Sequence, residues 1–409
     1  MGKGIKFQLI KSVKSGKNRW LFLGFLVYII GFCVFLGFKE RSYDENQKNI
    51  LNYELQEYGD RLKIISAKLK DMDEAEDRYN QLKIENDFYQ SQYNSSMLMI
   101  TALDKRIKGS KETTEDSLNF IIAKAMKYEG IKQGYDNGVI DDDYLQERDL
   151  SIEEVERYIN YISQLVEEKL PLPINPYTLS GESFLRNFFT GANMIIVLAF
   201  ILLFVIDSYV IELRDDCYKT IYTSPLKRNK LLLSKIIASY ILVVLVISLG
   251  LLLGFIGVSL TFGWGHLSSI VQMNEGVNGL KLMVENINQT YMTLSSVAIF
   301  NFISFLVFAL FIVIFSVSLS VYTSNDILSL GIMISLIMIT YIIHSVGDFM
   351  NINRTFNPFA YIFFEDFSDF HLKIGNFYGM VIQITLSALI LGITTLKFRK
   401  SDLFGVKGD

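Results

Sequence analysis

Residue types that commonly catalyse reactions are scarce in this sequence. The three histidines are His266, His344 and His371, and none of them lies in an HExxH metal-binding motif. A Gly-x-Ser-x-Gly nucleophile motif and a Gly-x-x-x-x-Gly-Lys-Ser/Thr phosphate loop are also missing from the chain. We therefore expect no catalytic residue in it.

One cluster of side chains has the right types for a cation. Glu365, Asp366 and Asp369 lie close to His371 in the sequence, and oxygen and nitrogen donors of this kind bind divalent ions. A solvated acidic surface is the commoner origin of such a cluster, so we expect no metal site. The two cysteines are too far apart in the expected topology to pair.

The most informative stretch is 212–235, ELRDDCYKTIYTSPLKRNKLLLSK. Tyr218, Ile221 and Tyr222 recur at i, i+3 and i+4, which places them on one side of a short helix. Pro225 ends that helix, because proline has no amide donor and disfavours helical geometry in the residue before it. Such a helix suits docking into a soluble partner, whereas an ordinary charged loop that only fixes topology is the alternative.

This stretch resembles the cytoplasmic loop of ABC-2 type transporter permeases, which have a type V-like fold. The residues that match the pattern of that loop are Glu212, Pro225, Arg228 and Lys235, and Ile221 takes the place of a leucine. The departures are Asp216 and Ser234 in place of glycines and Cys217 in place of a threonine. The resemblance implies that the stretch couples the spans to a separate ATPase, through Glu212, Tyr218, Ile221, Tyr222, Pro225, Arg228 and Lys235.

Composition and charge predict a membrane protein with a large polar domain. Half of the 409 residues are hydrophobic and a fifth are charged, with a mean hydropathy of +0.29. Residues 1–19, 212–235 and 397–409 are rich in Lys and Arg, which marks them as cytoplasmic. Residues 39–169 together with Glu182 comprise about 30 acidic against about 19 basic residues, which suits the outside of the cell.

The predicted fold is an all-α integral membrane protein with six transmembrane helices and a large helical extracellular domain between the first and second. The expected segments are 1–19, a basic amphipathic segment; 20–38, the first span; 39–187, a helical, partly coiled-coil outer domain; 188–211, the second span; 212–235, the coupling loop and helix; 236–262, the third span; 263–293, an outer loop; 294–322 and 327–346, the fourth and fifth spans; 347–374, an outer or re-entrant hairpin; 375–396, the sixth span; and 397–409, a cytoplasmic tail.

Within the outer domain, apolar residues alternate in steps of four and three from Leu51 to Met72, which predicts a coiled-coil seam. The phase slips near Asp73, so an unbroken two-stranded coil is not expected, and Gly59 is a possible break. Ser151 and Glu154 predict a capping box at the start of a later helix.

Polar residues within the apolar runs are candidates for a substrate path. Asn301 and His344 are of this kind, since such groups tend to face a bundle interior; simple hydrogen bonding between helices is the commoner explanation. Asn357 and Pro358 lie in an aromatic-rich hairpin that resembles the outer gate of ABC-2 permeases. Gly250 and Gly254 form a GxxxG pair, which favours close helix packing within one subunit over a homodimer seam.

The expected function is that of the permease subunit of an ABC exporter for a peptide, drug or lipid-like substrate. The abundance of Ile, Lys, Asn, Tyr and Phe indicates a bacterial protein, expected in the plasma membrane, and six spans with cationic inner segments place both termini in the cytoplasm. The resemblance implies a cytoplasmic ABC ATPase dimer, which would bind ATP and magnesium, and a second permease subunit, identical or homologous. Membrane lipid is a further expected partner, whereas nucleic acid is not. The alternative is a membrane-anchored scaffold, receptor or secretion component whose helical outer domain binds a partner.

Overall fold

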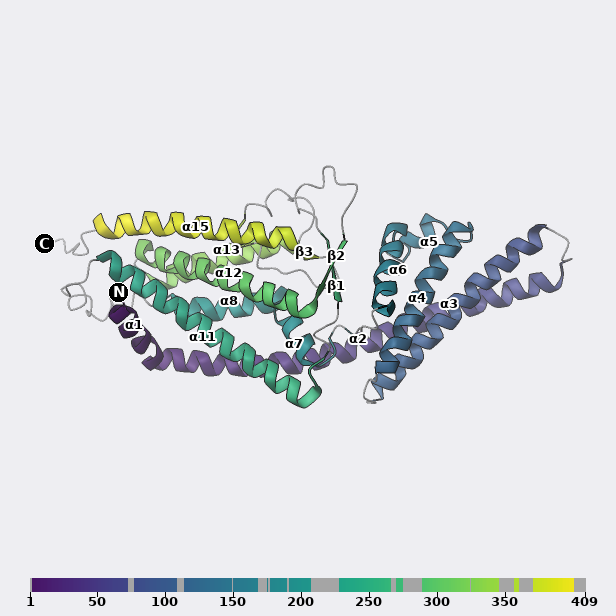
Figure 1. Ribbon diagram of the computed structural model, residues 1–409, viewed down its shortest axis with the longest axis horizontal. Helices are drawn as coiled ribbons and strands as arrows, with labels where there is room; N and C mark the ends of the chain where they lie inside the picture. The colour runs from purple at the N-terminus through teal and green to yellow at the C-terminus, as the bar shows by residue number, and fades with distance from the viewer. Residues whose placement is uncertain are drawn as a thin grey trace. The chain divides into compact units, whose positions relative to one another are not determined.

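The computed structural model describes residues 2–72, 77–108, 114–148, 150–167, 175, 177–189, 191–206, 228–265, 270–274, 289–323, 325–345, 357–359 and 371–400. They form two compact units. We call the first the bundle unit (Met1–Cys33, Phe184–Gly263 and Val271–Asp409) and the second the polar unit (Val34–Ser183 and Trp264–Ile270). Helices dominate both units, as predicted (Figure 1).

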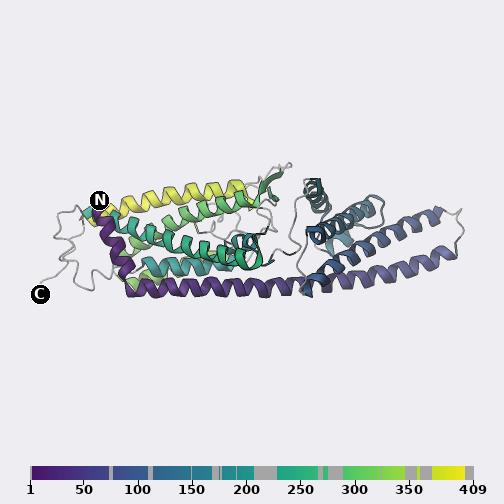
Figure 2. The same cartoon turned by 60° about the horizontal axis from the view of Figure 1, so that its bottom comes forward.

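The bundle unit is built around helix α12 (Leu294–Thr323). α12 packs against α8 (Gly191–Val205), α11 (Arg228–Phe262), α13 (Asp326–Ser345) and α15 (Lys373–Lys400). Figure 2 shows these helices side by side. Apolar residues are spread all round α12, and Phe305, Ile312 and Val317 are buried. A helix that is hydrophobic on every side must be covered by others or by lipid.

Among the described residues, four helices contain stretches long and apolar enough to cross a membrane, judged by length and composition. They lie in Gly16–Lys70, Asn229–Phe262, Ala298–Thr323 and Gly379–Phe398. Two shorter apolar helices, Asn193–Val205 and Asp326–Thr340, overlap the predicted second and fifth spans. Each of the six predicted spans thus overlaps a helix.

Three short strands are an exception that the sequence did not predict. β1 (Ile270–Asn274), β2 (Gln289–Thr293) and β3 (His371–Leu372) form a sheet in the order β2-β1-β3. β1 and β3 are parallel, with Met273 opposite His371. Strands this short have too few residues for a period-two pattern to stand out. Their pairing brings the predicted loop 263–293 and hairpin 347–374 together.

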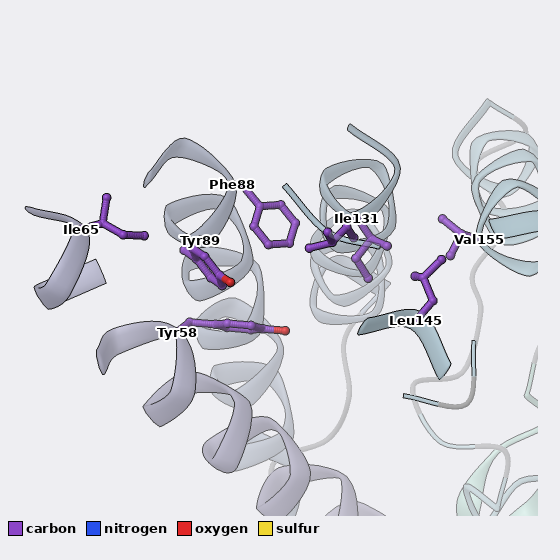
Figure 3. Close-up of a cluster of buried hydrophobic side chains, with 8 residues drawn as sticks. Tyr58, Ile65, Phe88, Tyr89, Ile131, Leu145 and Val155 are labelled. Carbon is purple, nitrogen blue, oxygen red and sulfur yellow. The ribbon is translucent and has the colours of Figure 1, made fainter. Parts of the chain in front are cut away.

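The polar unit contains the later part of α2 (Gly16–Lys70), α3 (Asp77–Ile107), α4 (Thr114–Asp136), α5 (Asp142–Gln146) and α6 (Ile152–Glu167). The predicted seam of α2 is buried inside this single chain. Figure 3 shows Tyr58 and Ile65 of α2 in one cluster with Phe88 and Tyr89 of α3. The rings of Tyr58 and Tyr89 are 6.1 Å apart, and burial raises the pKa of the Tyr58 hydroxyl above its ordinary value.

The coiled-coil pattern changes phase where the chain turns from one helix into the next. α2 ends at Lys70 and α3 begins at Asp77, which explains the slip near Asp73. Gly59 does not break α2, which continues as one helix past it. Glycine weakens a helix by only about 0.5 to 1 kcal/mol, and the apolar seam on both sides of Gly59 outweighs that.

Local polar contacts fix the ends of elements in the polar unit. The predicted capping box is present: the Ser151 amide donates to Glu154 Oε2 at 2.9 Å, and the Glu154 amide donates to Ser151 Oγ at 3.3 Å. Arg106 of α3 is buried between Glu40 and Asp44 of α2 at 2.8 and 3.2 Å. Asn175 donates to Asp44 at 2.8 Å, so the returning chain is held at the same ion pair.

The GxxxG pair of α11 lies against helices of the same chain, as favoured from the sequence. A methyl group on Gly250 would overlap the ring of Phe25, and one on Gly254 would overlap Phe184 and Ile29. Gly257, one turn further along α11, has nothing within 4 Å of that position. The two glycines therefore allow α2 and α7 (Gly181–Phe188) to approach α11 closely.

Replacing Gly254 with alanine is expected to lower the free energy of unfolding by about 1 to 3 kcal/mol, because the added methyl overpacks the interface. Gly257→Ala is the matched control on the same helix and should be neutral or slightly stabilising. Thermal unfolding of both variants in one detergent, followed by circular dichroism, measures the difference. Equal midpoints for the two variants would contradict this packing role.

Candidate functional site

Most of the predicted coupling residues lie outside the described residues. These are Glu212, Tyr218, Ile221, Tyr222 and Pro225.

The described part of that stretch belongs to a long helix. Arg228 is the first residue of α11, which begins eight residues before the predicted third span at 236. Lys235 is buried in α11. From Arg228 onward, this stretch is therefore part of an apolar helix of the bundle.

The two predicted path residues lie on neighbouring helices. Asn301 is buried in α12, and Ser304, one turn later, contacts Met380 of α15 at 3.7 Å. His344 belongs to α13, and its side chain lies outside the described part. The structure thus places Asn301 inside the bundle, as expected of a polar residue in an apolar run.

The predicted hairpin contains a short turn, Asn357–Phe359, that is bonded to two helices of the bundle. Asn357 Nδ2 donates to Thr340 Oγ1 of α13 at 3.2 Å. Gln383 Nε2 of α15 donates to the Pro358 carbonyl at 3.0 Å. The turn is also closed on itself, because the Phe359 amide donates to Asn357 Oδ1 at 3.0 Å.

The third residue of the turn packs against the central helix. The Phe359 ring lies 5.4 Å from Phe311 and 6.1 Å from Phe315 of α12, edge to face in both cases. Phe311 and Phe315 are themselves stacked at 5.8 Å. Edge-to-face pairs of this kind add about 0.5 to 1.5 kcal/mol each beyond area burial.

The turn reaches into the bundle and does not stay at its end. Phe311 is 17 residues from the start of α12 and 12 residues from its last residue, or about 26 and about 18 Å at 1.5 Å per residue. Thr340 and Gln383, the hydrogen-bond partners of the turn, are both buried. The turn Asn357–Phe359 therefore lies among the bundle helices.

The chemistry of this site is packing and hydrogen bonding. Every polar group just described is an amide, a hydroxyl or a carbonyl, and none ionises at neutral pH. Among the described residues, no group of three or more His, Cys, Asp or Glu side chains is arranged to hold a metal ion. Glu365, Asp366 and Asp369 of the acidic cluster lie outside the described residues, and so does the side chain of His371.

Sequence reasoning identified Asn357 and Pro358 but missed their partners. Gln383 is a polar residue within the apolar helix Gly379–Phe398, so the criterion that selected Asn301 would also have found it. Thr340 gives a weaker signal, because threonine is common in membrane helices and bonds its own backbone; its hydroxyl donates to the Leu336 carbonyl at 2.9 Å.

The apolar helices packed around α12 are those of a multi-pass membrane protein. The chain belongs to the ABC-2 transporter family: the family model described as "ABC-2 family transporter protein" matches residues 19–398. The chain is thus an ABC-2 type permease, the membrane component of a transport system. No curated protein and no solved structure matches it.

Replacing Gln383 with leucine is expected to lower the free energy of unfolding by about 1 kcal/mol, because the Pro358 carbonyl loses its donor. The amide of Phe359 should then exchange with solvent faster. Thr385→Val is the control, because Thr385 is exposed on the same helix and donates only within it, to the Val381 carbonyl. Hydrogen exchange read by mass spectrometry compares the two; equal rates would contradict the proposed anchoring of the turn.

Proposed function

We propose that the chain is the permease subunit of an ABC exporter and works with a separate ATPase. The family match over residues 19–398 is the observation that carries this proposal. The sequence supports it further, since it has no phosphate-binding loop and therefore needs an outside source of ATP energy. ATP and magnesium belong to that partner.

Six crossings fit the described helices. α12 and α13 are joined by a tight turn, in which Asn325 Oδ1 accepts from the Ile327 and Leu328 amides at 3.0 and 3.1 Å. α13 is therefore capped at its start and can return directly through the membrane beside α12. With α8 as a crossing, the segments 212–235 and 397–409 face the cytoplasm and the polar unit faces outward.

In this proposal residues 212–228 transmit the closure of an ATPase dimer to the spans. The start of α11 at Arg228 supports the idea, because it places the end of this segment on a rigid helix. Rigid elements joined to a mobile partner convert a small displacement into a switch between two packings.

The Asn357–Phe359 turn supplies the outer gate. Its two hydrogen bonds, to Thr340 and from Gln383, hold a closed arrangement, and the Phe359 ring fills the space beside Phe311. Opening would exchange these contacts for contacts with the cargo. A gate lined by aromatic rings suits an amphipathic cargo such as a peptide, drug or lipid.

A second candidate function is that of a scaffold or receptor. The polar unit has its own hydrophobic core, in which Tyr58, Leu145 and Val155 are buried, so it can present a stable surface to a partner. An ABC ATPase that co-purifies with the chain from its own membrane favours the exporter. Full function without any ATPase favours the scaffold.

Tyr222→Ala and Arg228→Ala are each expected to weaken ATPase binding by about 2 kcal/mol, roughly a 30-fold loss of affinity, because tyrosine and arginine dominate interface energies. Transport in proteoliposomes that contain both subunits, and the amount of co-purified ATPase, measure the loss. The controls are Tyr53→Ala, an exposed tyrosine of the polar unit, and Lys230→Ala, an exposed residue of α11. Wild-type transport by both test variants would count against this interface.

Cys217 offers a direct test of topology, since the chain has only one other cysteine, Cys33. In a Cys33→Ser background, a membrane-impermeant maleimide should leave Cys217 unlabelled in intact cells and label it after permeabilisation. A cysteine replacing Asn137, in an exposed turn of the polar unit, should react in intact cells. Labelling of Cys217 from outside would overturn the proposed arrangement.

A further inference from the structure

Helix α1 (Gly2–Lys14) presents an outward face that mixes apolar and basic residues. Phe7, Ile10 and Val13 are 58%, 46% and 56% exposed. Lys6 and Lys14 are also exposed, and at i−4 and i+4 they lie in one row with Ile10. The face therefore has an apolar centre with a lysine above and below it.

Not all apolar residues of α1 lie on this exposed face. In the structure Ile5 and Leu9 are half-buried, and Gln8 is buried with them. α1 packs against α11, so the apolar residues of α1 are divided between that helix and the outside.

The direction of α1 is fixed by contacts at the corner with α2. Ser15 is the only residue between the two helices. The Asn18 side chain donates to the Ser12 carbonyl at 2.9 Å, and Arg19 Nε donates to the Val13 carbonyl at 3.4 Å. These bonds satisfy the last carbonyls of α1. In Figure 1, α1 lies at the end of the bundle where α11 begins.

Charge identifies the occupant of this face. The first 39 residues contain no Asp or Glu, so nothing on α1 neutralises Lys6 and Lys14 locally. The apolar stretch of α2 begins directly after the corner, at Trp20, which is 76% exposed. Tryptophan at this position is typical of a membrane interface, and lysine stems can cover apolar surface while the ammonium groups reach headgroups.

We infer that the outward face of α1 docks on acidic phospholipids of the leaflet at this end of the bundle. Phe7, Ile10 and Val13 enter the boundary between headgroups and acyl chains, and Lys6 and Lys14 bind headgroup phosphates. A water-facing helix would leave these apolar side chains without cover. This docking goes beyond the proposed transport function and holds whichever cargo is moved.

The test uses the full chain in lipid vesicles, with tryptophan fluorescence read at one place on α1. Phe7→Trp in a Trp20→Phe, Trp264→Phe background gives a single reporter. Vesicles contain phosphatidylcholine and phosphatidylglycerol, and in each sample only one of the two lipids is brominated, so that it quenches nearby tryptophan. The ratio of the two quenching efficiencies measures which lipid lies beside α1.

We expect about a fivefold preference for brominated phosphatidylglycerol, which falls as salt is added because exposed charges are screened. Lys6→Glu with Lys14→Glu should abolish the preference. Lys68→Glu with Lys70→Glu is the control, since it makes the same charge change at exposed residues of the polar unit and should leave the preference intact.

Two results would overturn the inference. Equal quenching by both brominated lipids means that α1 meets the bilayer without selecting acidic headgroups. Quenching by neither lipid means that a protein partner or water covers this face. Quenching by the two brominated lipids is compared in the protein that keeps Lys6 and Lys14. This comparison tests the inference even where the charge-reversed variant fails to fold. The outcome does not depend on ATPase binding, so it is separate from the test of the proposed function.

Discussion

Non-helical backbone can lie among apolar membrane helices only where protein groups supply its hydrogen bonds. The Asn357–Phe359 turn meets this constraint with three bonds, in which Thr340, Gln383 and the turn's own Asn357 take part. Because two of these bonds join the turn to α13 and α15, the position of the turn depends on the position of both helices. A change in helix packing therefore changes the stability of the turn.

The same constraint explains the central position of α12. It contributes Phe311 and Phe315 to the contact with the turn, and it packs against α8, α11, α13 and α15. Its buried Ser320 hydroxyl donates to the Ile206 carbonyl at 3.1 Å. A helix in contact with four others passes a displacement of any one of them to the rest, since close-packed interiors deform little.

The polar unit is stabilised by an apolar core between its helices and by a buried ion pair. Its helices bury an apolar seam between α2 and α3, and Arg106 of α3 is enclosed by Glu40 and Asp44 of α2. A buried ion pair adds less to stability than its geometry suggests, because both charges lose their hydration. Its effect here is on specificity. Thr178 accepts a hydrogen bond from Arg106, and Asn175 donates one to Asp44, so the two charged groups hold the returning chain in a defined position.

The sequence by itself determined helicity, the apolar segments, the Ser151 capping box and the apolar seam of α2, because each depends on residues within a few turns of one another. It also pointed to Asn301 and Asn357, and its coupling-loop pattern agrees with the family to which the chain belongs. Only the tertiary structure decided what each feature contacts. The seam of α2 packs against α3 of the same chain, Asn357 meets Thr340, Gln383 meets Pro358, and Met273 is paired with His371. Such pairs join residues far apart in the chain, and their selection depends on how whole helices pack, which no local pattern encodes.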